Sequence, residues 1–154
     1  MRIEQVMTRD VRTCSPADTL SRAAELMWQT DCGCVPVLDD ERRVVGLVTD
    51  RDLAMAAYLQ GRRLDEIDVA SVMSRDVATC SHRDPPEAAE LKMQERRVRR
   101  LPVIDDAGTL VGIVSLADLV YCMMHRQTFG ADGMNWVEIG RTLASVSEPR
   151  QRTP

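Results

Sequence analysis

Aromatic residues are scarce in this sequence: two Trp, two Tyr and one Phe among 154 residues, or 3%. The core must therefore be built from Val, Leu, Ile, Ala and nine Met, which pack small elements closely. A surplus of positive charge is also missing, since the formal net charge is −4 and the pI is near 5.2. Nucleic acids and anionic membranes attract proteins through excess Lys and Arg. The composition therefore excludes nonspecific binding to either, and any anion site must be local.

Long apolar runs are absent as well. No stretch approaches the roughly 18 consecutive apolar residues that a membrane span needs, and the first five residues lack the apolar segment of a signal peptide. We therefore expect a cytoplasmic protein without a membrane partner. Five Cys is an odd number, which suits reduced thiols better than a disulfide framework.

Signs of catalysis or metal binding are missing too. The two His lie near no nucleophile pattern, the glycine spacings of P-loops and dinucleotide-binding folds are absent, and no carboxylate pair is placed as acid and base. We expect no enzymatic activity and no required cofactor. Cys32-Gly33-Cys34 lacks the second close Cys pair of a structural zinc site, so buried thiols are expected and no metal site is predicted.

What the sequence does contain is an internal repeat. Four blocks recur in the same order: residues 6–15 as 72–81, Ala23-Ala24-Glu25-Leu26 as Ala88-Ala89-Glu90-Leu91, residues 35–40 as 101–106, and Gly46-Leu47-Val48-Thr49 as Gly112-Ile113-Val114-Ser115. This order predicts repeat 1 over residues 1–66, repeat 2 over 67–126, and an extension over 127–154. In the extension we expect a short helix with Trp136, Ile139, Leu143 and Val146 on one face, followed by a disordered tail.

Each repeat carries the signals of a strand, a helix, two strands and a second helix. Ser15, Pro16 and Asp18 predict a helix start. The first helix should then bury Leu20, Ala23, Ala24 and Met27. Residues 34–38 and 44–48 predict a hairpin, and a second helix with its face at Leu53, Ala56 and Ala57 should end at Gly61. The fold class is therefore α+β, with two β-α-β-β-α repeats related by a pseudo-twofold axis.

The junction between strand and second helix has the same pattern in both repeats. Gly46-Leu47-Val48-Thr49 is followed by Asp52, and Gly112-Ile113-Val114-Ser115 by Asp118. One interpretation is a capping box, which satisfies free N–H groups at a helix start. The other is a ligand site, because a hydroxyl at a helix N-terminus attracts phosphate and a carboxylate one turn later can bind a ribose diol. Both interpretations remain open on residue pattern alone.

A basic run, Arg96-Arg97-Val98-Arg99-Arg100, stands out in this acidic chain. Most charge runs are solvated faces. Four neighbouring guanidinium groups repel one another unless anions offset them, so a phosphate partner is the alternative hypothesis.

These paired motifs resemble the CBS domain family, named after cystathionine β-synthase. The resemblance is carried by Asp10-Val11-Arg12-Thr13, Val35-Pro36-Val37 and the Gly46–Asp52 segment with their counterparts, over about residues 3 to 125. It implies that the two repeats pack through their sheets, that such modules commonly form homodimers, and that clefts between repeats bind AMP, ADP, ATP or S-adenosylmethionine.

The resemblance also implies two sets of ligand-binding residues. One cleft would use Ser115, Asp118, Arg99 and Arg100, with Asp10, Val11, Cys32 and Gly33 against the adenine; the other would use Thr49 and Asp52 with Asp76, Val77 and Val98. Gly33 and Cys34 stand where the second repeat has Arg99 and Arg100, so we expect the Ser115–Asp118 cleft to bind the more highly charged nucleotide. Lys92 is aligned with Met27, which predicts a rotated or partly exposed helix in the second repeat.

The leading hypothesis is a regulatory module whose ligand changes its contacts with a separate, unidentified protein. The rival is a dimerisation or docking module that binds no ligand. A thiol-based redox or metal sensor that uses Cys32 and Cys34 is a third alternative.

Overall fold

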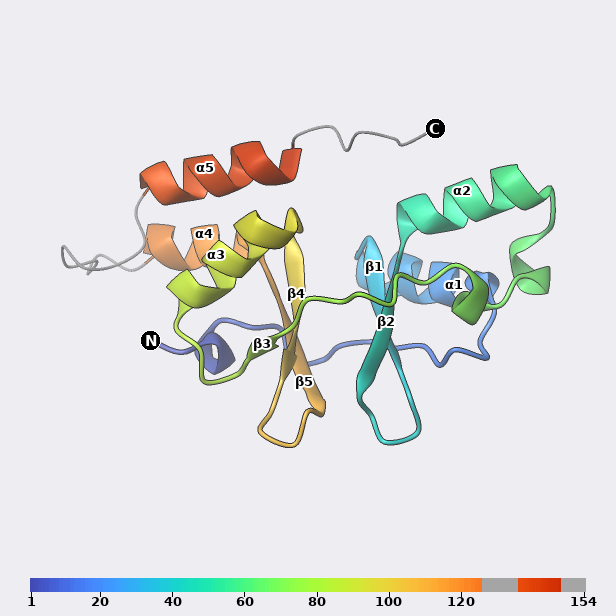
Figure 1. Ribbon diagram of the computed structural model, residues 1–154, viewed down its shortest axis with the longest axis horizontal. Coiled ribbons are helices and arrows are strands. Elements are labelled where there is room, and N and C mark those ends of the chain that lie inside the picture. The colour runs from blue at the N-terminus through green and yellow to red at the C-terminus, as the bar shows by residue number, and fades with distance from the viewer. Residues whose placement is uncertain (126–135, 148–154) are drawn as a thin grey trace. The chain divides into compact units, whose positions relative to one another are not determined.

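The computed structural model describes residues 1–125 and 136–147. A helix, two strands and a second helix occur twice in the same order, which confirms the α+β class (Figure 1). The elements are α1 (Leu20–Thr30), β1 (Cys34–Leu38), β2 (Val44–Thr49), α2 (Asp50–Gln60), β3 (Cys80–Ser81), α3 (Pro86–Arg96), β4 (Arg100–Ile104), β5 (Leu110–Ser115), α4 (Leu116–His125) and α5 (Trp136–Ser147). Within the described residues, no helix is both long and apolar enough to cross a membrane.

The first repeat is built on the predicted hairpin. β1 pairs antiparallel with β2, from Cys34 opposite Thr49 to Leu38 opposite Val44. The turn between them is held by Asp39, whose Oδ1 accepts from the amides of Glu41 and Arg43. Burial of β1 along its whole length fits a strand covered by helices. Gly61 ends α2 with φ +60°, as the sequence indicates.

The predicted start of the first helix at Ser15 is wrong. Ser15 and Asp18 instead close a turn, because the Asp18 carboxylate accepts from the Ser15 amide at 2.7 Å. The chain then runs extended through Thr19, which pairs with Asp68 and caps α1 by accepting from the Arg22 amide at 3.4 Å. The helix face is as expected at Leu20, Ala23 and Met27, which are buried, and Leu26 joins them.

The second repeat repeats the first with a constant shift of 66 residues. α1 and α3 both span 11 residues, and the residues that follow them, Asp31 and Arg97, both adopt left-handed backbone. Met93, not Lys92, therefore takes the place of Met27, and it is fully buried. The alignment of the two Ala-Ala-Glu-Leu blocks is therefore wrong by one residue. The prediction of a rotated or partly exposed helix rested on that alignment and is wrong as well. Lys92 is instead held by the Thr79 carbonyl, at 2.8 Å from its Nζ.

The compact units of the structure do not follow the order of the repeats. One unit holds residues 1–9, 78–105 and 111–154, and the other holds 10–77 and 106–110. The leading segment of each repeat belongs to the unit that holds most of the other repeat. Thr8 bridges to Ile113 on β5, and Ser74 bridges to Leu47 on β2. The predicted boundaries at residues 66 and 126 describe the repeats in sequence and remain a prediction for the domains.

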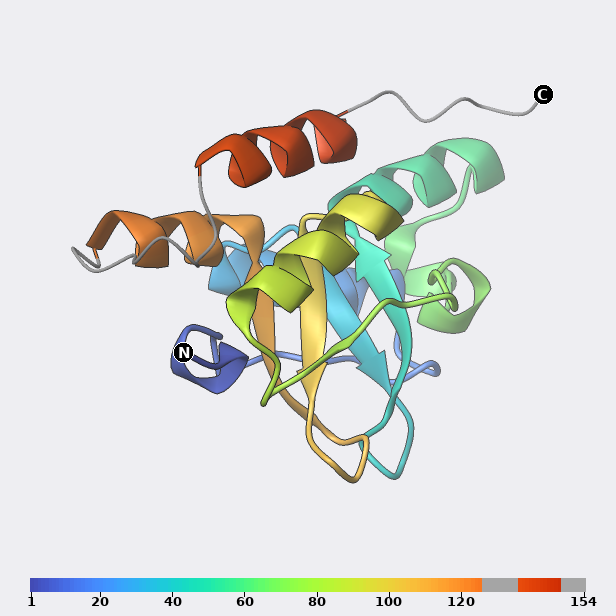
Figure 2. The ribbon, with the colours of Figure 1, turned by 60° about the vertical axis from the view of Figure 1, so that its left-hand side comes forward.

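Helix α5 belongs to the first of these units and lies along α3 (Figures 1 and 2). Ile139 is buried in the core of the unit, Val146 packs against it, and Thr142 is completely buried. Leu143, expected on the same face, is 53% exposed, because positions 139, 142 and 146 already fill the contact. The side chain of Trp136 and the expected disordered tail lie outside the described residues.

Candidate functional site at the strand-to-helix junctions

The Thr49 junction is a complete capping box. Thr49 ends β2 and caps α2: its Oγ1 accepts from the Asp52 amide at 3.3 Å, and its own amide donates to Asp52 Oδ2 at 2.9 Å. The Thr49 hydroxyl donates to the same oxygen at 2.7 Å. Asp52 Oδ1 therefore keeps its acceptor capacity, since the hydrogen bonds of this carboxylate to described residues all use Oδ2. The capping interpretation is confirmed here, and an acceptor remains for a ligand.

The Ser115 junction has the same geometry in the other compact unit. Ser115 ends β5, and its amide and hydroxyl donate to Asp118 Oδ2 at 2.8 and 2.7 Å. The Asp118 amide returns a bond to Ser115 Oγ at 3.1 Å. Both side chains are partly exposed. A serine hydroxyl and a carboxylate oxygen at a helix start suit the hydroxyl groups of a sugar.

Arg99 and Arg100 lie beside this second junction. The Arg99 carbonyl accepts from the Leu116 amide at 2.9 Å, which fixes the start of β4 next to the start of α4. Arg99 is exposed and Arg100 partly exposed, and neither guanidinium has an ion pair with a described residue. The backbone of two arginines without an ion pair to a described residue thus lies next to the helix start that carries the hydroxyl and the carboxylate. Guanidinium groups and helix N-termini both attract phosphate.

Gly33 and Cys34 occupy the equivalent place at the Thr49 junction. The Gly33 carbonyl accepts from the Asp50 amide at 3.1 Å, the counterpart of the bond between Arg99 and Leu116. A Cβ on Gly33 would lie 2.9 Å from the Asp50 carboxylate, so the glycine allows that carboxylate to approach closely. This junction therefore carries negative charge where the other one carries two arginines.

The remaining predicted adenine contacts lie in extended segments. Asp10 is exposed and lies 3.9 Å from Arg12, and Val11 is partly buried. Asp76 and Val77 follow the bridge between Ser74 and Leu47, so they share a compact unit with Thr49 and Asp52. Asp10, Val11, Cys32 and Gly33 lie in a different unit from Ser115 and Asp118, and Val98 in a different unit from Thr49. The pairings across the units remain predictions.

Two methionines that position these segments were not identified from the sequence. Met7 and Met73 lie over Gly112 and Gly46, where a Cβ would come within 3.0 Å of the Cγ of the methionine and nearer still to Sδ. They hold the segments that lead to Asp10 and Asp76. The signal was present, because Val-Met precedes both Asp residues at the same spacing and a Gly opens both junction motifs.

The cysteines bear out the expectation of buried thiols at three positions, Cys14, Cys34 and Cys80. Cys14 and Cys80 are 3% and 2% exposed, and burial raises the pKa of Cys14 to about 11 and that of Cys80 to about 12. Among residues 1–125 and 136–147, no group of three or more His, Cys, Asp or Glu is arranged to hold a metal ion.

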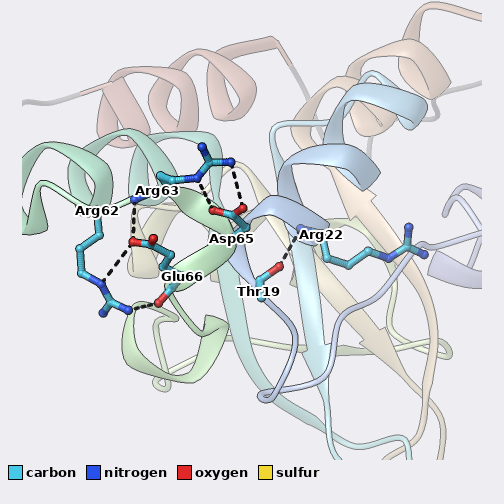
Figure 3. A network of polar contacts seen from close by, with 6 residues as sticks. All are labelled: Thr19, Arg22, Arg62, Arg63, Asp65 and Glu66. Atoms are coloured by element: carbon cyan, nitrogen blue, oxygen red, sulfur yellow. Dashed lines mark hydrogen bonds and ion pairs between the residues drawn. The ribbon is translucent and has the colours of Figure 1, made fainter.

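A polar network after α2 contributes no ligand-binding group of this kind. The Arg63 guanidinium donates two hydrogen bonds of 3.0 and 3.1 Å to the Asp65 carboxylate, and Arg62 forms an ion pair with Glu66 (Figure 3). The Arg63 guanidinium lowers the pKa of Asp65. All four charges are paired with one another in solvent, so the network shapes the turn between the repeats and leaves no charge free for an anion.

Comparison with known proteins finds relatives of this chain. The chain is 36% identical over 129 residues to the CBS domain-containing protein YhcV of Bacillus subtilis, covering 84% of this chain and 90% of YhcV. It spans 60% of a relative from Methanopyrus kandleri and 22% of the inosine-5'-monophosphate dehydrogenase of Methanocaldococcus jannaschii.

Solved structures of CBS domain proteins have a similar fold. A CBS-domain containing protein from Agrobacterium tumefaciens matches with a TM-score of 0.70 at 29% identity, over 80% of this chain and 99% of its own. CBSX2, solved in complex with AMP, matches with a TM-score of 0.70 at 26% identity, over 80% of this chain and 96% of its own. The model of the CBS domain matches residues 3–58 and again 69–125, which together make up more than half of the sequence. The chain therefore belongs to the CBS domain family, with two copies of the domain in tandem.

Proposed function

We propose that this protein is a regulatory module that binds an adenine nucleotide or adenosyl compound and catalyses no reaction. AMP, ADP, ATP and S-adenosylmethionine are the candidate ligands. Support comes from membership of the family and from CBSX2, which binds AMP. The ligand would act by binding one conformation of the module better than another, because only differential affinity shifts such an equilibrium.

The observation that carries this proposal is the composition of the Ser115 junction. Asp118 Oδ2 accepts the hydrogen bonds of the helix cap, which leaves Oδ1 to accept from ribose hydroxyls. Arg99 and Arg100 supply positive charge for phosphate at the start of the neighbouring strand. Adenine would be held by Asp10, Val11, Cys32 and Gly33, and in the second site the ligand would meet Thr49, Asp52, Asp76, Val77 and Val98.

The two sites should prefer different ligands. Gly33 and Cys34 replace the two arginines at the Thr49 junction, and the Asp50 carboxylate lies against Gly33. Because like charges repel, ATP should favour the Ser115 site over the Thr49 site.

Calorimetric titration with AMP, ATP and S-adenosylmethionine tests the proposal, with two variants of Asp118. Asp118→Glu keeps a carboxylate at the third position of the capping box, where Glu is the usual residue, but moves it relative to a bound ribose. Asp118→Ala removes both cap and ligand group. We expect at least one ligand to bind the unaltered protein, and both variants to lose at least about tenfold in affinity. Binding of none of the three ligands, or unchanged binding by Asp118→Glu, would contradict a ribose contact at Asp118.

The rival function is a dimerisation or docking module, and it is favoured by three exposed side chains. Trp28 on α1 is 90% exposed, and Tyr58 and Leu59 at the end of α2 are 79% and 72% exposed. Large apolar groups in solvent are typical of interfaces. We propose that the protein forms a homodimer and contacts a regulated protein that is still to be identified, whether or not nucleotide binds.

A further inference from the structure

Cys32 and Cys34 are neighbours in space as well as in sequence. Their Sγ atoms lie 4.0 Å apart, and the Cys32 thiol donates to the Cys34 carbonyl at 3.3 Å. The chain bends at Gly33 between them. A disulfide needs the sulfur atoms at about 2.05 Å, which small rotations of the two side chains and of the flexible glycine can supply.

This pair is attached directly to the Thr49 junction. Cys34 is the first residue of β1 and pairs with Thr49, the last residue of β2 and the cap of α2. Between the cysteines, the Gly33 carbonyl accepts from the Asp50 amide, the first of α2. A change in the geometry of the Cys-Gly-Cys segment therefore acts on the helix start that holds Thr49 and Asp52.

We infer that Cys32 and Cys34 form a reversible disulfide that changes the conformation of the Thr49 junction. The oxidant is a low-molecular-weight disulfide, RSSR. The Cys32 thiolate attacks one sulfur and releases RS⁻, which gives a mixed disulfide; the Cys34 thiolate then attacks Cys32 Sγ and releases the second RS⁻. Two electrons pass from the cysteines to RSSR, and the two thiol protons end on the two released RSH.

Exposure fixes the order of these steps. Cys32 is partly exposed and can meet the oxidant, whereas Cys34 is only 6% exposed and attacks from within. Cys14 and Cys80 are buried with raised pKa values, so their thiolates are rare. The second repeat has Val98 and Arg100 at the equivalent positions, which confines the switch to one of the two junctions.

The disulfide closes a small ring around Gly33 and turns its peptide plane. The hydrogen bond from the Asp50 amide to the Gly33 carbonyl should respond most to this change, because the carbonyl carbon is an atom of the ring and its oxygen turns with the peptide plane. Losing it loosens the first turn of α2. The effect on nucleotide binding rests on the proposed function, whereas the disulfide and its effect on Asp50 do not.

The test equilibrates the full-length protein with mixtures of glutathione and glutathione disulfide. After alkylation, peptide mapping by mass spectrometry should find Cys32 joined to Cys34 at oxidising ratios, and glutathione should reverse it. Hydrogen exchange should show the Asp50 amide exchanging about tenfold faster in the oxidised protein. Cys34→Ser should stop at the mixed disulfide on Cys32 and keep slow exchange, and Cys122→Ser should behave as the unaltered protein.

Two results would overturn the inference: Cys32 found only as the glutathione adduct while Cys34 stays alkylatable at every ratio, or a disulfide that leaves exchange at Asp50 unchanged. Titration of both redox forms with AMP provides the separate comparison. Failure of both forms to bind nucleotide counts against the proposed function alone, since mapping and exchange are read without ligand.

Discussion

Met73 lies directly over Gly46, and a Cβ on this glycine would stand 3.0 Å from the Cγ of Met73 and nearer still to its Sδ. Met7 makes the same contact with Gly112. The glycine that opens each junction motif is thus needed for close packing and does not require unusual backbone angles. These contacts hold the leading segment of each repeat against a strand of the other.

Gly46→Ala should therefore destabilise the protein by about 1 to 3 kcal/mol through overpacking. The matched control is Gly140→Ala on α5, where nothing lies within 4 Å of a new Cβ. In a helix that substitution should stabilise by about 0.5 to 1 kcal/mol. Urea denaturation of both variants measures the difference, and effects of the same sign would refute the packing argument.

The contact between α5 and α3 should depend on a buried pair. Thr142 donates its hydroxyl to the carboxylate of Glu90, and both residues are almost fully buried. Thr142→Val keeps the shape and removes the bond, which should cost about 1 to 3 kcal/mol because a buried carboxylate loses a donor. Leu143→Ala on the exposed face of the same helix should stay within about 0.5 kcal/mol of the unaltered protein. Chemical denaturation should rank the two variants in this order.

Alkaline pH should destabilise the protein through its buried thiols. The pKa of Cys80 is about 12 in the folded chain against an ordinary 9.0, and that of Cys14 is about 11. Above pH 9.0 the unfolded chain loses these protons while the folded chain keeps them, so the free energy of unfolding falls as pH rises from 9.0 towards 12. Cys80→Ala should show a shallower fall than the unaltered protein when denaturation is followed across this range. Equal slopes would mean that the Cys80 thiol does not ionise differently in the two states.

Arg99 and Arg100 should decide how much charge the Ser115 site accepts. Replacing both by Gln should weaken ATP more than AMP, because each guanidinium bonded to phosphate contributes about 1.5 to 3 kcal/mol. Arg51→Gln at the start of α2 is the control for loss of one exposed positive charge near the other junction. Calorimetry at two salt concentrations should show a smaller salt dependence for the double variant. Equal losses for AMP and ATP would count against a phosphate contact by these residues.

Trp28 should mark the surface through which copies associate. Its 90% exposure on α1 leaves a large apolar ring in solvent. Trp28→Glu should shift the protein towards the monomer in light scattering after size-exclusion chromatography, while Arg22→Glu on the exposed surface of the same helix should have a smaller effect. An unchanged mass for Trp28→Glu would place the interface elsewhere.

The repeat, the hairpin of the first repeat, the helix end at Gly61 and the two capping boxes were all readable from the sequence. Each depends on residues close to one another in the chain, so local patterns suffice. The start of α1 could not be predicted from the sequence, because Asp18 could equally cap a helix or close a turn on Ser15. Pairing of Thr19 with Asp68, 49 residues away, decides between them.

The sequence by itself determined that this chain is a tandem pair of α+β repeats with a hydroxyl and a carboxylate at each strand-to-helix junction. Only the tertiary structure decided that Met7 and Met73 cross to the other repeat's strand, that Glu90 is buried under Thr142, and that two cysteine sulfurs meet beside Thr49. Periodicity and capping act within a few residues, whereas the methionine contacts, the burial of Glu90 and the pairing of Cys34 with Thr49 depend on how distant segments fill the space beside a glycine, a helix or a strand.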